Sequence, residues 1–358
     1  MRKKPLRKTL PKDLDALFDA AATSGNDAPV RAALEACEPD ARSTFGNQTP
    51  LMSRRCTPAI ARWLVERGTD VNATNTWGRT ALHESAFARF HHALSPEVLI
   101  ALGADVHLRS NQGLTPLHSA ADGKNVASAT LLLAHGADLN ARTNNGLTPL
   151  EYGLFRMSNA ELVAMVPFAQ FLLAAGAQVT PKAQSAVLTA AQTFEFYRAK
   201  FARDSVEEAS AACAALCALF GVIPPPRRLM HDGAAPIVVT GATWRQRHEA
   251  LWQLLVPSSG ACATVQGEVI RITGRVLDEL RRNGGGNWDA DYTSMVAALC
   301  EHLASHTALS PADLAEAHAA QRAVRRDDAA PDRLAELAVA WVGRNPTPIP
   351  LPKPGYTR

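Results

Sequence analysis

Four segments of this chain begin with nearly the same four residues, and their spacing is the feature that most constrains the fold. They lie at 49–52, 80–83, 115–118 and 148–151 and read T-P-L-M, T-A-L-H, T-P-L-H and T-P-L-E. The steps between them are 31, 35 and 33 residues. Such a period is typical of stacked arrays, in which each unit buries its apolar face only against its neighbours. We therefore expect a solenoid with an extended recognition surface.

A second motif closes each unit. It reads G-T-D-V-N-A at 68–73, G-A-D-V-H-L at 103–108, G-A-D-L-N-A at 136–141 and, more loosely, G-A-Q-V-T at 176–180. Together the two motifs resemble ankyrin repeats, strongly over 40–180 and over about 10–220 with degenerate end units. The resemblance implies an all-α solenoid of helix–turn–helix units with β-hairpin fingers. It also implies that His83 and His118 form hydrogen bonds between neighbouring units.

The residue types of the motif suit these roles. Threonine is a good N-cap, proline suits the first helical position, and the following leucine points inward. Glycines such as Gly136 are placed where a helix ends with positive φ. The unit 148–176 is longer than the others, and its surplus around 157–167 predicts a lengthened helix–helix connection. This insertion either carries partner contacts or is a tolerated surface insertion.

Changes in composition divide the chain into five parts. We expect a disordered basic leader at 1–9, an array of five to six units at 10–220, a linker at 221–242, a helical domain at 243–343 and a proline-rich tail at 344–358. The linker follows from Pro224–226 and includes a predicted short strand at 237–240. The C-terminal domain predicts helices at about 243–256, 264–282, 291–305, 310–326 and 331–342.

The tail alternates proline at 346, 348, 350, 352 and 354, which favours an extended conformation. It either lies across the protein or serves as a ligand for another one. Ile349 and Leu351 give it an apolar edge and favour the first alternative.

Part of the C-terminal domain has a resemblance of its own. The runs L-V-P at 255–257, T-V-Q-G-E-V-I-R at 264–271 and R-N-G-G-G-N-W-D at 282–289 resemble an uncharacterised helical domain of bacterial proteins. The resemblance implies a bacterial source and no mechanism.

Composition excludes several classes of protein. The chain has 358 residues, of which 47% are hydrophobic, so wholesale disorder is excluded. The net charge of +3 gives no general case for nucleic-acid binding. No apolar run approaches the ~20 residues of a membrane span, and the basic N-terminus lacks the apolar region of a secretory signal. The six cysteines contain no CxxC pair and suit a reducing cytosol.

The resemblance places a partner-binding groove along the finger tips and the inner helices. Trp77 either stands exposed there or packs on the neighbouring finger. Arg79, Arg109 and Arg142 form either a basic ladder for an acidic protein partner or solvated surface. The full set of predicted partner-binding residues is Thr76, Trp77, Arg79, Phe87, Arg89, Arg109, Asn111, Gln112, Asp122, Lys124, Arg142, Asn144, Asn145, Phe155 and Arg156.

A possible second site lies in the C-terminal domain. Its residues are Gln266, Glu268, Arg271, Arg275 and Asp289. Spacings of three and four residues place much of this set on one helix face. It forms either a buried polar network or a cleft with Glu268 as its acid/base.

Other motifs predict no chemistry. The run Gly284–286 lacks the pattern of a phosphate loop and reads as a turn after a helix. His302 and His306 lack the HExxH arrangement and are predicted to be exposed, and Cys213 and Cys217 lie on an apolar helix stripe.

We therefore expect no enzyme, no metal and no cofactor. The expected function is protein–protein recognition in a bacterial cytosol, with no nucleic-acid or membrane partner. An immunity or antitoxin-like protein that covers a cognate toxin is the first hypothesis. The alternatives are a regulatory or host-directed adaptor and an enzyme with its site in 243–343.

Overall fold

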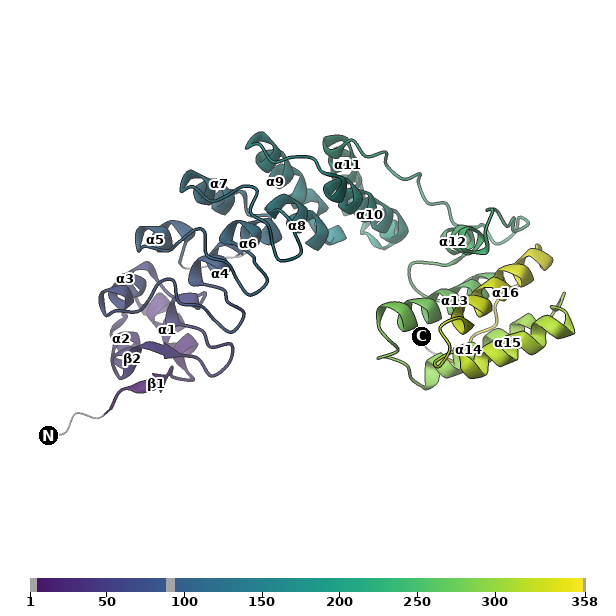
Figure 1. Ribbon diagram of the computed structural model, residues 1–358, viewed down its shortest axis with the longest axis horizontal. Helices are drawn as coiled ribbons and strands as arrows, with labels where there is room; N and C mark the ends of the chain where they lie inside the picture. The colour runs from purple at the N-terminus through teal and green to yellow at the C-terminus, as the bar shows by residue number, and fades with distance from the viewer. Residues whose placement is uncertain (1–4, 88–93, 357–358) are drawn as a thin grey trace. The chain divides into compact units, whose positions relative to one another are not determined.

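The computed structural model describes residues 5–87 and 94–356, which are mostly helical (Figure 1). They divide into two compact units. The first comprises the chain up to Phe194 together with Phe201–Pro225, and the second comprises Glu195–Lys200 and the chain from Pro226 onward. Among the residues described, no helix is both long enough and apolar enough to cross a membrane.

The first unit is a stack of helix pairs, with one row of inner helices and one row of outer helices (Figure 1). The inner helices α4, α6 and α8 contact one another in order, as do the outer helices α5, α7 and α9. The helices of this unit are α1 (Leu14–Ser24), α2 (Ala28–Glu35), α3 (Pro58–Glu66), α4 (Ala81–Phe87), α5 (Pro96–Ala101), α6 (Pro116–Gly123), α7 (Val126–Ala134), α8 (Pro149–Arg156), α9 (Leu162–Ala174), α10 (Pro181–Tyr197) and α11 (Arg203–Phe220).

Local sequence explains where these helices begin and end. Thr148 caps α8, because its Oγ1 accepts the amide of Glu151 at 3.3 Å. Asn125 caps α7 in the same way, with its Oδ1 3.0 Å from the amide of Ser128. Gly136 follows α7 with φ +84°, and its amide donates to the carbonyl of Leu133. The predicted capping threonine and terminating glycine are therefore confirmed here.

One continuous apolar core runs through the stack from Leu14 to Phe220. The leucines of the repeated motif, Leu51, Leu82, Leu117 and Leu150, are all buried in it. The inner helices α4 and α6 approach so closely that a Cβ atom placed on Gly123 would lie only 2.3 Å from the carbonyl oxygen of Phe87. Through such contacts with its neighbours, each unit of a solenoid buries the apolar face that it could not bury alone.

Two units depart from the regular pattern. In the first, the inner helix is reduced to a 3-10 turn, η1 (Pro50–Met52). In the unit 148–176, the surplus forms the turn η2 (Asn159–Glu161) and a 13-residue outer helix, α9, with Pro167 inside it. The predicted lengthening of the connection is confirmed, since residues 157–161 separate α8 from α9 whereas 124–125 separate α6 from α7. The rest of the surplus extends the outer helix.

The N-terminal end of the array contains a small sheet that the sequence did not predict. Strands β1 (Arg7–Thr9) and β2 (Cys37–Arg42) pair in parallel, with Arg7 opposite Cys37. The predicted disorder at 1–9 is thus wrong for residues 7–9. The backbone of β2 supplies hydrogen-bond partners that a local reading of this basic segment could not include.

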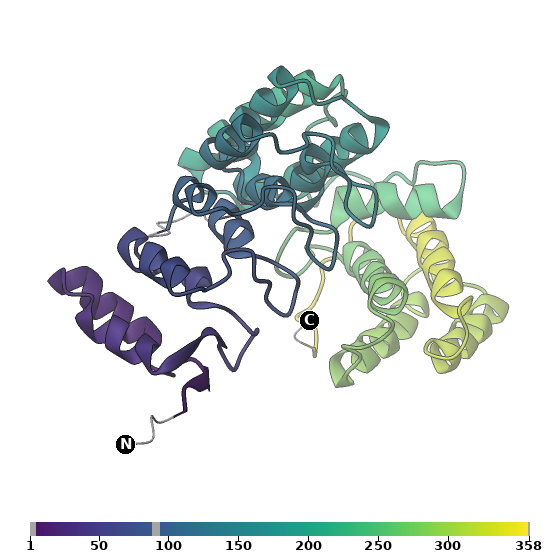
Figure 2. The ribbon, with the colours of Figure 1, turned by 60° about the vertical axis from the view of Figure 1, so that its left-hand side comes forward.

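The second unit is a bundle of five helices followed by the tail. The helices are α12 (Trp244–Leu255), α13 (Val265–Arg282), α14 (Ala290–Leu303), α15 (Pro311–Ala323) and α16 (Ala330–Arg344). Trp341 is fully buried in a core of its own. In Figure 2, α12 crosses the ends of α13 and α16, which it contacts.

The segment predicted as a linker packs largely on this second unit. Arg228 donates hydrogen bonds to the carbonyl oxygens of Trp252 (3.0 Å), Gln253 (2.7 Å) and Val256 (2.5 Å) at the end of α12. Residues 237–240 form no strand. Ile237 is nevertheless buried, and its amide donates to the carbonyl of Pro346 at 2.7 Å.

The proline-rich tail lies across the start of α13. Gln266 donates to the carbonyl oxygens of Asn345 (2.8 Å) and Thr347 (2.7 Å), and it accepts the amide of Ile349 at 3.1 Å. Tyr356 then donates from its hydroxyl to the carboxylate of Glu268 at 2.5 Å. Of the two alternatives that the sequence left open, the structure therefore has the tail packed on its own chain.

Replacing Tyr356 by phenylalanine should destabilise the second unit. The variant keeps the ring but removes a donor to the buried Glu268 carboxylate, which should cost about 1–3 kcal/mol. Urea unfolding of the full chain, with hydrogen exchange resolving the two units, measures the change. Tyr197→Phe removes a hydroxyl from a ring that is 37% exposed and should change stability little. Equal stability of the two variants would contradict the prediction.

Candidate recognition surface on the repeat array

Four loops project from the same side of the array (Figure 2), and we call them fingers. In three of them, the backbone amide of the first residue donates to the carbonyl of the last residue at 2.8–2.9 Å. These pairs are Asn75 and Arg79, Ser110 and Leu114, and Thr143 and Leu147. The fourth closes between Ser43 and Gln48. The glycine next to each tip, at 46, 78, 113 and 146, has φ between +69° and +75°, a conformation that glycine adopts at least cost.

The fingers are joined to one another by hydrogen bonds in sequence order. Asn111 donates its backbone amide to Trp77 (3.0 Å) and its side-chain amide to Thr76 (3.0 Å). Asn144 repeats this arrangement one unit later, with bonds to Gln112 (3.0 Å) and Asn111 (2.9 Å). The amides of these two predicted binding residues therefore hold the fingers in register.

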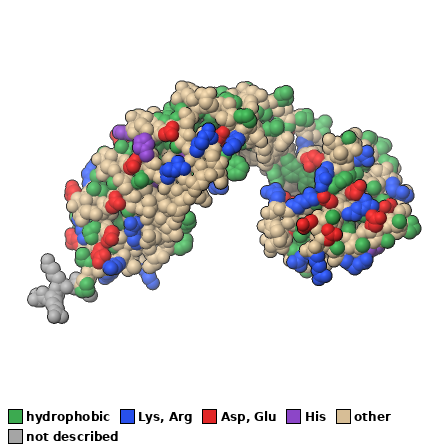
Figure 3. Space-filling model, viewed as in Figure 1, with side chains coloured by type: hydrophobic (Ala, Val, Ile, Leu, Met, Phe, Trp, Pro, Cys, Tyr) green, Lys and Arg blue, Asp and Glu red, His purple; other side chains and the backbone are tan. Residues whose placement is uncertain are grey.

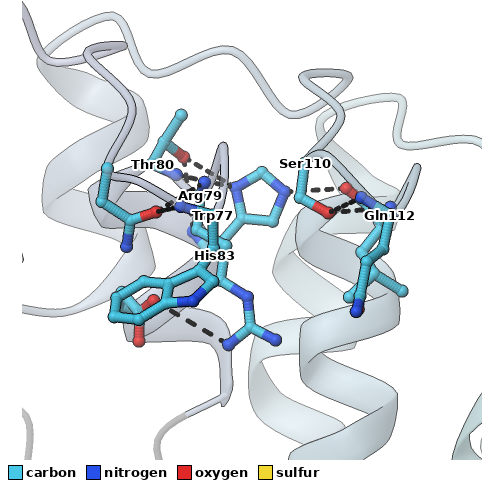
Figure 4. Close-up of polar contacts among 9 residues, drawn as sticks. Trp77, Arg79, Thr80, His83, Ser110 and Gln112 are labelled. Atoms are coloured by element: carbon cyan, nitrogen blue, oxygen red, sulfur yellow. Dashed lines mark hydrogen bonds and ion pairs between the residues drawn. The ribbon is translucent and has the colours of Figure 1, made fainter. Parts of the chain in front are cut away.

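Each complete unit is also fixed to the next by the last residue of its opening motif (Figure 4). The Nδ1 atom of His83 accepts the amide of Thr80 at 3.2 Å, so its Nε2 carries the proton and donates to the carbonyl of Leu114 at 2.9 Å. His118 makes the matching bonds to Thr115 (3.2 Å) and Leu147 (3.0 Å). The predicted hydrogen bonds between neighbouring units are confirmed.

In the fourth unit, Glu151 takes the place of histidine. Its carboxylate accepts the amide of Thr148 at 2.8 Å and the hydroxyl of Thr180, in the next unit, at 2.6 Å. Burial opposes ionisation of this carboxyl, but these two bonds prevail and hold its pKa below the ordinary value. A different residue type thus supplies the same bridge.

The residue just before each finger glycine forms the tip. At the first two tips stand Phe45 and Trp77, whose exposed fractions are 78% and 47%. Their rings meet edge to face, with centroids 6.2 Å apart. Trp77 also packs on the neighbouring finger, where a Cβ on Gly46 would lie 2.9 Å from its ring. Trp77 therefore combines both alternatives: it is packed and remains half exposed.

Sequence reasoning missed Phe45. The signal was present, since an aromatic residue precedes a finger glycine at 45–46 as it does at 77–78. The first finger is one residue farther from its threonine, Thr49, than the other fingers are from theirs, which hid the match.

The three arginines of the predicted basic ladder make contacts within the array, one with a carboxylate and two with carbonyl groups. Arg79 lies 3.9 Å from the carboxylate of Glu84. Arg109 donates to the carbonyl of Arg142 at 2.6 Å, and Arg142 donates to the carbonyl of Gly146 at 3.0 Å. A carbonyl group does not neutralise a guanidinium, so these two bonds fix the side chains in place and preserve their positive charge.

The inner-helix residues of the predicted set separate into exposed and buried members. Phe155 is 71% exposed at the end of α8, and Arg156 beside it lies 3.7 Å from Asp122 of α6. Lys124 is instead buried, with its ammonium 3.0 Å from Glu161. Of the others, Thr76, Gln112 and Asn145 are exposed, Phe87 is half-buried, and Arg89 lies outside the described residues.

A hollow of about 450 Å³ lies beside the first finger. Phe45 and Met52 line it together with Glu84, Asp15 and Arg55. Arg55 pairs with Asp15 (3.6 Å) and with the nearby Asp19 (2.5 Å). The exposed ring of Phe45 therefore adjoins a concave, polar surface, an arrangement suited to receiving part of another protein.

The possible second site is brought together only in part. Glu268 and Arg271 form a buried pair at 2.5 Å, and Gln266 holds the tail. Arg275 is exposed on the same helix, whereas Asp289 caps α14 through the amide of Tyr292 at 3.1 Å. Of the two alternatives, the buried polar network describes Glu268 and Arg271 with Tyr356, whereas Gln266 is buried and bonds separately to the backbone of the tail.

Of the two histidines predicted to be exposed, His306 is exposed. His302 is half-buried rather than exposed, and burial lowers its pKa. Within the described residues, no group of three or more His, Cys, Asp or Glu side chains could hold a metal ion.

Comparison with known protein families agrees with this geometry over part of the chain. The family model described as ankyrin repeats (3 copies) matches residues 53–143 and 88–183. The match leaves out α1 and α2, most of α10, and α11–α16. No curated protein matches the chain.

The array should lose stability in mild acid. Burial lowers the pKa of both His83 and His118 from 6.5 to about 4. Between pH 6.5 and pH 4 the unfolded chain binds more protons than the folded chain does. The contribution of the two neutral histidines to the free energy of unfolding is therefore complete above about pH 6.5 and is lost as the pH falls through about 4. The loss is on the order of 3 kcal/mol per histidine.

Urea unfolding at pH 7 and pH 5, followed by circular dichroism, measures this effect. The variant with His83→Ala and His118→Ala should be less stable at pH 7 and should show a much smaller difference between the two pH values. His107→Ala, which removes an exposed imidazole of the same array, serves as the control. An unchanged pH dependence in the double variant would show that other groups cause the acid sensitivity.

Proposed function

Because residues 53–183 consist of ankyrin repeats, which generally bind proteins, we propose that this chain recognises a protein partner through the finger tips of its array. The observation that carries the proposal is the pair Phe45 and Trp77. Two large aromatic side chains stand on adjacent fingers, 78% and 47% exposed, and the first of them, Phe45, lines a concave surface. Exposed aromatic clusters of this kind mark interaction sites, because their burial by a partner is strongly favourable.

The rigidity of the fingers supports this proposal. Backbone and asparagine bonds join each finger to the next, and the bridges of His83 and His118 fix the array below them. A surface that is already ordered loses little conformational entropy when a partner binds. The tips therefore present their aromatic rings in a geometry ready for binding.

The charges nearby favour an acidic partner. Arg109 and Arg142 are exposed and bonded to carbonyl groups, so each presents a positive charge on its finger. Figure 3 shows basic, acidic and hydrophobic side chains interspersed among neutral ones on the array face turned to the viewer, so the preference for an acidic partner depends on these two arginines. Carboxylates of a partner would be attracted to the arginines while apolar groups cover the aromatic rings.

The specific role that we propose is that of an immunity or antitoxin-like protein in a bacterial cytosol, with a cognate toxin as the acidic partner. A regulatory or host-directed adaptor is the alternative within the same class. The support for either role is fold-level analogy. We further propose that the chain is not an enzyme, since the candidate acid/base Glu268 is fully buried and bonded to Arg271 and Tyr356.

Co-expression with the products of neighbouring genes tests both the proposed protein recognition and the proposed immunity role. A neighbour that is toxic alone should be neutralised by this chain and should co-purify with it. The variant with Phe45→Ala and Trp77→Ala should bind that neighbour about tenfold to a hundredfold more weakly. Leu188→Ala, which truncates a 37%-exposed side chain of α10, serves as the control and should bind normally.

The outcomes separate protein recognition from the immunity role. A neighbour that co-purifies without being toxic supports recognition and contradicts the immunity role. Equal affinity of the double variant and the Leu188→Ala control would contradict the assignment of the finger tips.

A further inference from the structure

A second concave surface lies wholly within the C-terminal unit, between the start of α14 and the end of α15. It has a volume of about 710 Å³, within the usual range for binding pockets. Its lining contains three arginines and no carboxylate: Trp288, Thr293, Val296, Gln321, Arg322, Val324, Arg325 and Arg326. We call it the arginine hollow.

The three arginines differ from others of the same unit. Arg333 lies close to three carboxylates, the nearest at 2.6 Å, and Arg245 and Arg281 share Asp332. Across the described residues, by contrast, Arg322, Arg325 and Arg326 enter no ion pair, and all three are exposed. No carboxylate lines the hollow with them, although Asp327 and Asp328 follow directly in the chain and line the hollow next to it. Like charges gathered in one hollow repel one another, and an anionic partner would relieve that repulsion.

Two stacked aromatic rings lie beside these arginines. The ring of Trp288 is stacked on that of Tyr292, with centroids 5.2 Å apart and planes at 20°. The guanidinium of Arg325 lies 5.8 Å from the centre of the Trp288 ring. Arginine and tryptophan are the residue types that dominate binding energy at protein interfaces.

The glycine-rich turn before Trp288 has a function in this arrangement. The amide of Trp288 donates to the carbonyl of Gly285 at 3.2 Å. The buried carboxylate of Glu279 accepts the amide of Asn287 at 2.6 Å and the side chain of Asn283 at 3.0 Å. The run from Gly284 to Asn287 is thus a turn held by Glu279, and it fixes where the tryptophan stands.

The hollow continues along the surface. Val324 and Arg325 also line an adjoining hollow of about 470 Å³, which includes Arg281 and Leu280. Asp327 and Asp328 also line this second hollow. A ligand that extends along both would therefore place its anionic groups at the three arginines and an uncharged part beside these two carboxylates. Acidic and basic side chains are otherwise interspersed on the face of this unit shown in Figure 3.

We propose that the arginine hollow docks an extended acidic peptide segment of a protein partner. Carboxylates of the segment pair with Arg322, Arg325 and Arg326, and an apolar or aromatic side chain lies on Trp288. This site is separate from the finger tips, so the chain has two independent surfaces for protein recognition.

Fluorescence anisotropy with the full chain tests the proposal. The probe is a fluorescein-labelled octapeptide of alternating Asp and Glu with one central Tyr. The variant with Arg322→Gln, Arg325→Gln and Arg326→Gln should bind it at least about tenfold more weakly. The control variant, with Arg227→Gln, Arg344→Gln and Lys353→Gln, removes the same charge from exposed positions outside the hollow and should bind nearly as wild type does.

Further measurements define what would overturn the proposal. Equal weakening by both triple variants would show that the peptide responds only to net charge. Tighter, arginine-dependent binding of an oligonucleotide of equal charge, or of phosphatidylglycerol vesicles, would show that the occupant is not a peptide. Trp288→Ala should weaken binding while Trp288→Phe retains it, and the Phe45→Ala and Trp77→Ala variant should bind normally. That last result separates this site from the finger tips.

Discussion

The array depends on a bridge in which one side chain joins its own helix start to the backbone of the next unit. In His83 and His118 the two nitrogens of a neutral imidazole perform both tasks, one as acceptor and the other as donor. The bond to the next unit falls on the last residue of a finger, Leu114 or Leu147. The same hydrogen bond therefore joins two units and positions a finger. The geometry of the recognition surface thus depends on the contact that holds the stack together.

The sequence predicted the regular part of this architecture because each motif residue acts locally. A threonine cap, an inward leucine and a terminating glycine require only their own helix, so a repeated pattern reveals them. Glu151 shows the limit of the pattern. It departs from the histidine of earlier units but provides the same bridge, since its two oxygens reach Thr148 and Thr180.

What the sequence did not predict depends on distant partners. Strand β1 exists through hydrogen bonds to residues about 30 positions away, and the tail is fixed by Gln266, about 80 positions before it. The same distinction applies to the candidate site. The position of Trp77 at a tip followed from its glycine, whereas its contact with Phe45 depends on how two fingers pack. The involvement of Asn111 and Asn144 in joining fingers likewise becomes visible only once the units are stacked.

The alternating prolines of the tail have a consequence for association between copies of the chain. In an extended segment, successive residues direct their backbone groups to opposite sides. Ile349 and Leu351 direct theirs toward the protein, where both amides donate, to Gln266 and Ala263. The position between them, Pro350, and the positions on either side, Pro348 and Pro352, are proline, so the outer edge of this stretch offers carbonyl groups but no amide donors. An exposed edge of this kind cannot form a full ladder with a strand of another molecule. The composition that lets the tail lie flat on its own domain thus also protects the chain from edge-to-edge aggregation.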